Sequence, residues 1–566
     1  MTDQQLGPPD DRQSPSAAPR RDIGQIVSGS LVEGVFMKLH PEESVEDIRA
    51  GKFVVVEGEK NEFFSMITDV VLSTSVRGLL DNPPGRDNRL MHQVLSGTST
   101  YGTVMLRPML MLTKEDAASD PESSLRPVKT IPGHFSPVFT ADAADVNRIF
   151  GDESVDPRYF HVGTPLDMDD TPVCLNLERF VERSNGIFGK SGTGKTFLTR
   201  IVLCGMIKNR KAVNLVFDMH SEYGWKGTVE GERAEVRGLK QYFGDRVAVF
   251  SLDPDSSRRR GAPIDFEVKI PYSQVTVDDI ILLQHELNLS PTALETCYAL
   301  VNRFSESRWL SELIRMDADA IIEFCEANNV HQASLSALQR KLRVLTGSCK
   351  SFLLDDKEQK ADVDAVRQIM SYLESGKHVV LEFGQHTQPL RYMLVANILT
   401  RRIHDNYVKQ TEESLGGDKP KPQPLVITIE EAHKFLGPTL ANQTIFGTIA
   451  REMRKYNVTL LVVDQRPSGI DAEILSQVGT KITCLLNDER DIEAVLTGVS
   501  NASGLRGVLA SLDSKQQALV LGHAVPMPVV IQTRQYDDED FRLSMGSLPT
   551  AKEDELIERE IDRDFT

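Results

Sequence analysis

Residues 189–196 constrain this chain more than any other stretch, because they fit the pattern G-x-x-x-x-G-K-[ST]. They follow the short apolar pair Ile187 and Phe188 and precede the largely apolar run 197–203, so the sequence predicts a strand, a loop and a helix in that order. Such a loop turns its backbone N–H groups toward phosphate oxygens, and the helix adds the positive end of its dipole. The alternative is a chance glycine-rich turn, and the strand-loop-helix context argues against it.

The pattern therefore predicts a nucleoside triphosphate site with ATP and Mg²⁺ as cofactors. Lys195 would reach the β and γ oxygens as a point charge, and the hydroxyl of Thr196 would ligate Mg²⁺. The predicted nucleotide-binding residues continue from the loop into the helix and are Gly189, Lys190, Ser191, Gly192, Thr193, Gly194, Lys195, Thr196 and Phe197.

Composition narrows the classes of protein that remain. The chain has 566 residues and a formal net charge of −18, so it needs more than one core, and any nucleic-acid contact must come from a local basic surface. The six cysteines are scattered without a C-x-x-C pair, which indicates reduced core residues and no metal site. No apolar run reaches about 18 residues, and the N-terminus has no apolar segment, so we expect a cytoplasmic protein with no membrane contact.

The pattern of apolar and turn-forming residues changes several times along the chain and divides it into segments. Short β-rich runs separated by Gly, Pro and Asn predict a small barrel with a structural or docking role. Alternating strands and helices predict an α/β core, and apolar residues at helical spacing predict an insertion within it. The predicted segments are a disordered tail (1–22), the barrel (23–145), the first part of the core (146–272), the helical insertion (273–375), the second part of the core (376–545) and a charged C-terminal tail (546–566).

Acidic residues follow two of the predicted strands. Asp218 ends the run 213–218, and Glu222 comes shortly after it. The carboxyl ends of strands line the ligand crevice of doubly wound sheets, which is where both residues would fall. Asp218 is thus a candidate Mg²⁺ ligand, with a helix or turn cap as the alternative.

Glu430 and Glu431 end the apolar run 425–429. A P-loop enzyme needs a buried strand whose tip carries acidic residues, one directed toward Mg²⁺ and one that polarises the attacking water. The pair supplies both roles. A solvated turn is the alternative, but the preceding apolar residues and the P-loop favour the functional interpretation.

Polar residues also surround the predicted strand 458–463. Gln465 lies just past it, beside the expected γ-phosphate, and is placed to sense that group. Arg451 and Arg454 lie at the end of the preceding helix, far from their own site, so either is a candidate arginine finger for a neighbour's nucleotide. A basic solvated surface is the alternative.

With these residues assembled, the chain resembles the HerA family of the FtsK/HerA group of hexameric DNA translocases over nearly all of its length. The resemblance implies a RecA-like P-loop core with a helical insertion and an N-terminal HAS barrel. The ordered motifs that carry it are 186–196, 217–223, 430–433, 450–456 and 464–468.

The resemblance also implies roles and partners. Glu431 would be the catalytic base, Arg454 the arginine finger and Gln465 the phosphate sensor. Copies of the chain would form a ring, usually of six subunits, around double-stranded DNA, with a nuclease or effector docked on the barrel. One departure is Glu430, where P-loop ATPases commonly have Asp, so Asp218 is expected to share the Mg²⁺ role.

Three functions are consistent with the sequence. The first is an ATP-driven DNA translocase or helicase motor that feeds a partner nuclease in end processing and repair. The second is the motor or scaffold subunit of an anti-phage defence complex with a separate effector nuclease. The third is a P-loop switch or assembly ATPase without nucleic acid. For the first two, the loops near Trp225, Lys226 and Lys434 are candidate DNA contacts.

Overall fold

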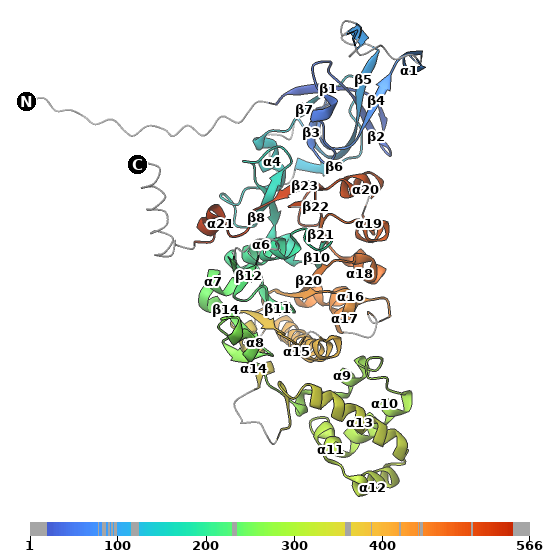
Figure 1. Ribbon diagram of the computed structural model, residues 1–566. Coiled ribbons are helices and arrows are strands. Elements are labelled where there is room, and N and C mark those ends of the chain that lie inside the picture. The colour runs from blue at the N-terminus through green and yellow to red at the C-terminus, as the bar shows by residue number, and fades with distance from the viewer. Residues whose placement is uncertain are drawn as a thin grey trace, which may run out of the picture. The chain divides into compact units, whose positions relative to one another are not determined.

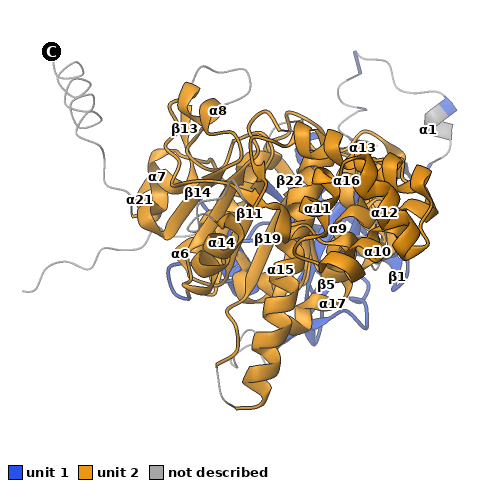
Figure 2. Cartoon of the chain, turned by 90° about the horizontal axis from the view of Figure 1, so that it is seen from below, with its two compact units in different colours: residues 1–156, 164–174, 526–532 blue, residues 157–163, 175–525, 533–566 orange. Residues whose placement is uncertain are grey.

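The structure is a computed structural model with two compact units (Figure 2). Unit 1 comprises residues 1–156, 164–174 and 526–532, and unit 2 comprises residues 157–163, 175–525 and 533–566. Residues 1–19 and 547–566 of the predicted tails lie outside the described residues. The structure describes residues 20–546 without 77, 82–86, 89–90, 92–93, 96–98, 115–123, 229–234, 357–363, 387, 418–419, 440, 442–444, 500–501 and 515.

Unit 1 is built on a closed barrel, as the sequence predicts. Its sheet has the order β2-β1-β7-β3-β4-β5-β6, and an additional pairing of β2 with β5 closes it. Val35, Met37 and Leu39 alternate along β2 and are at most 3% exposed, because period-two apolar positions face one side of a strand. The elements are β1 (Asp22–Ser30), β2 (Gly34–Leu39), β3 (Phe53–Glu57), β4 (Asn61–Thr74), α1 (Gly78–Asp81), β5 (Thr100–Thr113), β6 (Leu125–Pro127), β7 (Pro137–Thr140) and α4 (Ala143–Phe150).

Unit 2 contains a predominantly parallel sheet, which bears out the predicted α/β core. Its strands follow the order β15-β14-β18-β11-β19-β20-β10-β21-β22, with β22 antiparallel to β21. They are continuous apolar runs because helices cover both faces (Figure 1). The strands are β10 (Asn185–Phe188), β11 (Val213–Asp218), β14 (Val247–Ser251), β15 (Phe266–Glu267), β18 (His378–Glu382), β19 (Leu425–Glu430), β20 (Val458–Asp464), β21 (Thr480–Cys484) and β22 (Gln517–Gly522).

The helices of unit 2 connect these strands, and short strands complete the fold. The helices are α5 (Leu177–Val181), α6 (Lys195–Lys208), α7 (Leu239–Phe243), α8 (Pro254–Arg259), α14 (Ala365–Glu374), α15 (Pro389–Leu415), α16 (His433–Leu436), α17 (Ile445–Glu452), α18 (Ala472–Gln477), α19 (Glu489–Leu496), α20 (Ala502–Ala510) and α21 (Glu539–Ser544). The short strands β12 (Lys226–Thr228) and β13 (Glu235–Arg237) also belong to unit 2, whereas β8 (Tyr159–Pro165), β9 (Val173–Asn176) and β23 (Val529–Thr533) have residues in both units.

A group of helices interrupts the sheet between β15 and β18. It is bracketed by β16 (Ile270–Pro271) and β17 (Leu353–Leu354), which pair in parallel. Leu335, Leu338 and Leu342 are fully buried, as their helical spacing predicts. Helix α14 contacts β11, β18 and α15, so it packs on the core although the predicted insertion includes it. The helices of the group are α9 (Val277–Leu282), α10 (Pro291–Phe304), α11 (Trp309–Arg315), α12 (Ala318–Asn328) and α13 (Gln332–Ser348).

Candidate active site

A cavity of about 420 Å³ lies at the carboxyl ends of β10, β19 and β20. Parallel strands bring their carboxyl ends to one edge of a sheet, and the site residues therefore come from distant parts of the chain. Most of the residues predicted to bind or act on nucleotide line the cavity: Ser191, Gly192, Thr193, Gly194, Lys195, Thr196, Phe197, Glu430, Glu431 and Gln465. Of the remaining predicted residues, Gly189, Lys190, Asp218 and Arg454 do not line it.

The loop between β10 and α6 has the geometry of an anion cradle. Gly189 has a φ of +153°, and a Cβ there would lie 2.8 Å from both the Cβ of Cys484 and the Oγ1 of Thr193. Only glycine fits this position without a shift of its neighbours. The ammonium group of Lys195 donates to the carbonyl oxygen of Lys190 over 2.8 Å. This hydrogen bond keeps the positive charge of Lys195 beside the backbone of the loop.

Glu430 is a buried carboxylate at the tip of β19. Its Oε1 accepts a 2.9 Å hydrogen bond from the hydroxyl of Tyr223, while its Oε2 has no hydrogen-bond partner within the described part of the chain. Burial, followed by the nearby charges of Asp218 and Glu222, raises the pKa of Glu430 above the usual range of a carboxyl. A cation in the cavity would favour the charged form of this group.

Glu431 is joined to the P-loop through Gln465. Glu431 has a φ of +50°, a conformation that is uncommon for a residue other than glycine and that clusters at functional sites. Its Oε1 accepts a 3.0 Å hydrogen bond from Nε2 of Gln465, and Oε1 of Gln465 accepts a 2.6 Å bond from the hydroxyl of Ser191. The three side chains thus connect the loops that follow β10, β19 and β20.

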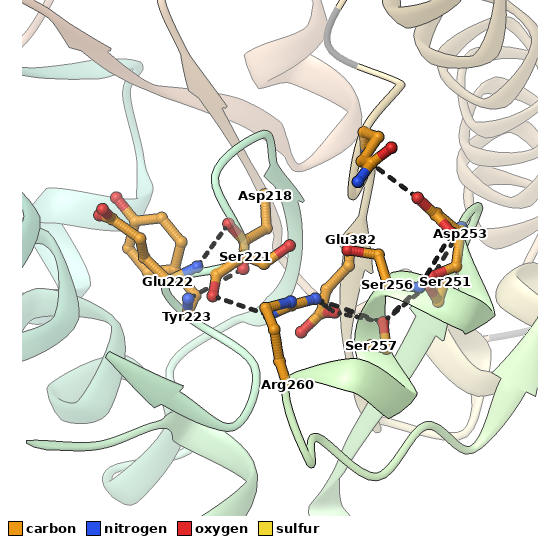
Figure 3. A network of polar contacts seen from close by, with 11 residues as sticks. Asp218, Ser221, Glu222, Tyr223, Ser251, Asp253, Ser256, Ser257, Arg260 and Glu382 are labelled. Carbon is orange, nitrogen blue, oxygen red and sulfur yellow. Dashed lines mark hydrogen bonds and ion pairs between the residues drawn. The ribbon is translucent and has the colours of Figure 1, made fainter. Parts of the chain in front are cut away.

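Asp218 caps a turn beside the cavity. Its two carboxylate oxygens accept backbone N–H bonds from Glu222 over 2.9 Å and from Tyr223 over 2.8 Å (Figure 3). Burial and then the charge of Glu382 raise its pKa. This is the geometry of a turn cap, the alternative that the sequence left open, and the Mg²⁺ role of Asp218 stays a prediction. Glu222, which Asp218 positions, lines the cavity.

A second network of hydrogen bonds, which starts at the end of β18, contacts the turn that follows β11. Glu382 is fully buried at the tip of this strand and accepts hydrogen bonds from Ser257 over 3.0 Å and from Arg260 over 2.8 Å. Arg260 also approaches the carbonyl oxygen of Ser221 at 3.5 Å (Figure 3). Neither Glu382 nor Arg260 was among the predicted site residues, although Glu382 ends an apolar strand just as Asp218 does.

His433 follows Glu431 by two residues, and its side chain is fixed by Asp464. Its backbone N–H donates to Oδ2 of Asp464 over 2.7 Å, and its ring Nδ1 lies 3.0 Å from the same oxygen. The hydrogen bond to Asp464 raises the pKa of His433. The carboxyl end of β20 is thereby tied to the segment that follows Glu431.

The candidate arginine fingers lie at the opposite edge of the sheet. Arg451 is in α17 and Arg454 is in the following 3₁₀ helix η5 (Met453–Tyr456), which precedes β20, whereas Gln465 follows β20. The Nη2 of Arg451 approaches the carbonyl oxygen of Ala441 at 3.5 Å, and Arg454 is exposed. Neither residue lines the cavity.

The basic residues suggested for DNA contact differ in their surroundings. Lys226 is exposed, and its ammonium group lies 2.5 Å from a carboxylate oxygen of Glu235, so its charge is already paired. Lys434 is half-buried in α16. Within the described ranges, no helix combines the length and apolar character needed to cross a membrane.

Comparison with known proteins gives one family match in the N-terminal region and a second in the P-loop region. Residues 160–403 match the family described as "Helicase HerA, central domain", and residues 23–88 match the "HAS barrel domain". The DNA double-strand break repair helicase HerA of Sulfurisphaera tokodaii is 37% identical over 522 residues, covering 91% of this chain and 93% of that protein. The HerA repair helicase of Pyrococcus furiosus is 22% identical over 433 residues, covering 74% and 76%. The solved structure of VirB4 from Thermoanaerobacter pseudethanolicus matches with a TM-score of 0.45 and 15% identity, covering 67% of this chain and 97% of that one.

Proposed function

This chain belongs to the HerA helicase family, and we propose that it is an ATP-driven double-stranded DNA translocase that works as a ring. In this proposal a partner nuclease docks on the N-terminal barrel, and the complex processes DNA ends during repair. The relatives from Sulfurisphaera tokodaii and Pyrococcus furiosus are repair helicases by name, which supports this role.

The observation that carries the proposal is the contact of Gln465 with both Ser191 and Glu431. Ser191 belongs to the P-loop, which would hold the phosphates, and Glu431 is the carboxylate that would act on water. In this proposal the glutamine between them senses the γ-phosphate and transmits its loss to the loop that follows β20. Coupling of hydrolysis to movement requires such a link.

The residues present fit ATP and Mg²⁺. The P-loop backbone and Lys195 would bind the phosphates, and Phe197 would contact the nucleotide beyond them. Thr196 and Glu430 would hold Mg²⁺, which would neutralise charge on the phosphate oxygens. The buried Oε2 of Glu430, which has no hydrogen-bond partner within the described residues, supports this assignment. Glu431 would orient the attacking water and accept its proton, and Glu222 adds a further carboxylate to the wall.

The position of Arg454 supports a ring. An exposed arginine at the opposite edge of the sheet cannot act on its own nucleotide, and a neighbouring subunit would bring it to one. The net charge of −18 also favours a ring, because weak contacts with DNA phosphates would add up over several subunits.

The test is the ATPase rate with and without linear double-stranded DNA. We expect the rate to rise severalfold with DNA, to fall back as salt is added, and to be lost in both conditions in Glu431→Gln. The same assembly should displace streptavidin from the end of a biotinylated duplex in the presence of ATP and not of ADP. An ATPase rate that ignores DNA, together with no displacement, would favour a P-loop switch and overturn the translocase proposal.

A further inference from the structure

The order of the strands around the P-loop indicates which way a bound nucleotide would run. Strand β10 pairs with β20 on one side and with β21 on the other. Glu431 and Gln465, the residues that would act on the γ-phosphate, follow β19 and β20. The base of the nucleotide would therefore extend toward β21 and β22, on the other side of the P-loop.

Gln516 lies on that side and lines the cavity. It directly precedes β22, whose antiparallel pairing places Ala518 opposite Cys484 at the carboxyl end of β21. The backbone N–H of Lys190 donates to the carbonyl oxygen of Leu485, so the P-loop and the segment after β21 adjoin. Gln516 has a φ of +61°, and its carbonyl oxygen accepts a 2.7 Å hydrogen bond from the N–H of Thr533. Its unusual backbone conformation is thus held in place.

Phe197 lines the same cavity and has a fixed ring. The Cζ of Arg200 lies 5.3 Å from the centroid of the Phe197 ring and 5.5 Å from that of Tyr536, and the two rings are 6.0 Å apart. Arg200 is 1% exposed and donates from Nη2 to the carbonyl oxygen of Glu222. Its Nε and Nη1 have no hydrogen-bond partner within the described residues, so stacking on the aromatic rings is what accommodates this part of the guanidinium.

We propose that Phe197 and Gln516 form a base subsite that selects adenine, with Arg200 and Tyr536 as the positioning residues behind Phe197. A flat aromatic ring stacks on any base, whereas a carboxamide presents N–H donors next to a carbonyl acceptor. Adenine presents the complementary pair at N6 and N7, while guanine presents two acceptors, O6 and N7, at the same edge. The inference rests on the proposed function only in requiring a nucleoside triphosphate in this cavity.

The test uses calorimetric titration of the full chain with Mg²⁺ and the β,γ-imido analogues of ATP and GTP. The wild type should bind the adenine analogue about tenfold more tightly, the difference that one good hydrogen-bonding pair makes. In Gln516→Ala this preference should fall to near unity. In Phe197→Leu both analogues should bind about tenfold more weakly, with the preference kept.

Two controls separate base reading from damage to the P-loop. Inorganic tripolyphosphate, which has no base, should bind the wild type and both variants equally. Gln517→Ala removes the neighbouring glutamine, whose side chain bonds to Asp513, and should leave the adenine preference intact. Equal binding of the two analogues by the wild type, or a preference that survives Gln516→Ala, would overturn the base subsite. Failure of the wild type to bind either analogue would overturn the nucleotide site and the proposed function with it.

Discussion

The hydroxyl of Tyr223 donates a 2.9 Å hydrogen bond to Oε1 of Glu430, joining residues that are 207 positions apart in the sequence. Both groups are buried, with Tyr223 at 0% and Glu430 at 6% exposure. Tyr223 is itself placed by Asp218, which accepts its backbone N–H. The turn cap therefore acts on the candidate Mg²⁺ ligand indirectly, through the tyrosine.

Tyr223→Phe should lower ATP hydrolysis about tenfold and raise the Mg²⁺ concentration needed for half-maximal rate. The hydroxyl orients Glu430, and a hydrogen bond to a charged group contributes about 1.5–3 kcal/mol. The measurement is the ATPase rate as a function of Mg²⁺ concentration, with the change in KM for Mg²⁺ kept apart from the change in kcat.

Tyr392→Phe is the matched control for this substitution. Tyr392 is equally buried, but its hydroxyl has no hydrogen-bond partner in the described part of the chain, so its removal should leave both the rate and the Mg²⁺ dependence unchanged. Equal effects from the two substitutions would mean that Tyr223 acts only through packing.

Lys195→Ala and Glu431→Gln should fail in different ways. The lysine offsets phosphate charge in the bound state, so its loss should abolish nucleotide binding or turnover. Glu431→Gln should retain ATP and hydrolyse it about 10²- to 10⁴-fold more slowly, because a general base acts only during the reaction. The amide oxygen can still accept the hydrogen bond from Gln465. Nucleotide binding and single-turnover hydrolysis measure the two effects, and near wild-type turnover in Glu431→Gln would refute its role.

The parts of this site that the sequence predicted are those set by local pattern. The P-loop and the residues at the tips of β19 and β20 follow from short motifs on apolar strands, since parallel strands align their carboxyl ends. The hydrogen bonds that Asp218 accepts from the turn were not predictable, because a strand position does not say whether backbone amides will occupy the carboxylate. Gln516 lies outside every motif found in the sequence, and the antiparallel pairing of β22 with β21 is what brings it to the cavity. Arg200 lies within a helix whose other residues are mostly apolar, and its contact with Tyr536 joins segments far apart in the chain.

Buried His378 should make stability fall as the solution becomes acidic. Burial, and then the charge of Arg246, lowers its pKa to about 3, and its Nδ1 accepts the backbone N–H of Asn214 in the neutral form. The unfolded chain binds this proton near pH 6.5 and the folded chain does not, so stability is lost as pH decreases below that value. The loss between pH 7 and pH 5 is about 2 kcal/mol.

The measurement for His378 is the midpoint of thermal unfolding at pH 7 and pH 5. His378→Gln keeps an acceptor for Asn214 but cannot titrate, so its unfolding temperature should fall less between the two pH values than that of the wild type. His331→Gln removes an exposed histidine and should behave as the wild type. An unchanged pH dependence in His378→Gln would show that other groups cause the acid sensitivity.

Arg454 should act on the nucleotide of a neighbouring subunit. It precedes β20, whose seven residues at about 3.3 Å each place it roughly 20 Å from the end of the sheet that carries Gln465. A finger supplied in trans contributes on the order of 10³- to 10⁵-fold in rate. Arg454→Ala and Lys195→Ala should each be nearly inactive alone, and mixing them should restore part of the activity, because some interfaces then join an intact P-loop to an intact finger.

Light scattering must first establish that both variants form rings of the same size. Lys455→Ala provides the matched control, since Lys455 is the neighbouring exposed cation, whose ammonium group lies 3.8 Å from a carboxylate oxygen of Glu452, and this variant should be active by itself. Recovery in the mixture requires that the arginine cross a subunit interface, since neither variant contains both groups. Assembled rings that show no recovery would leave Arg454 as part of a basic solvated surface, and the finger would then have to come from elsewhere in the chain.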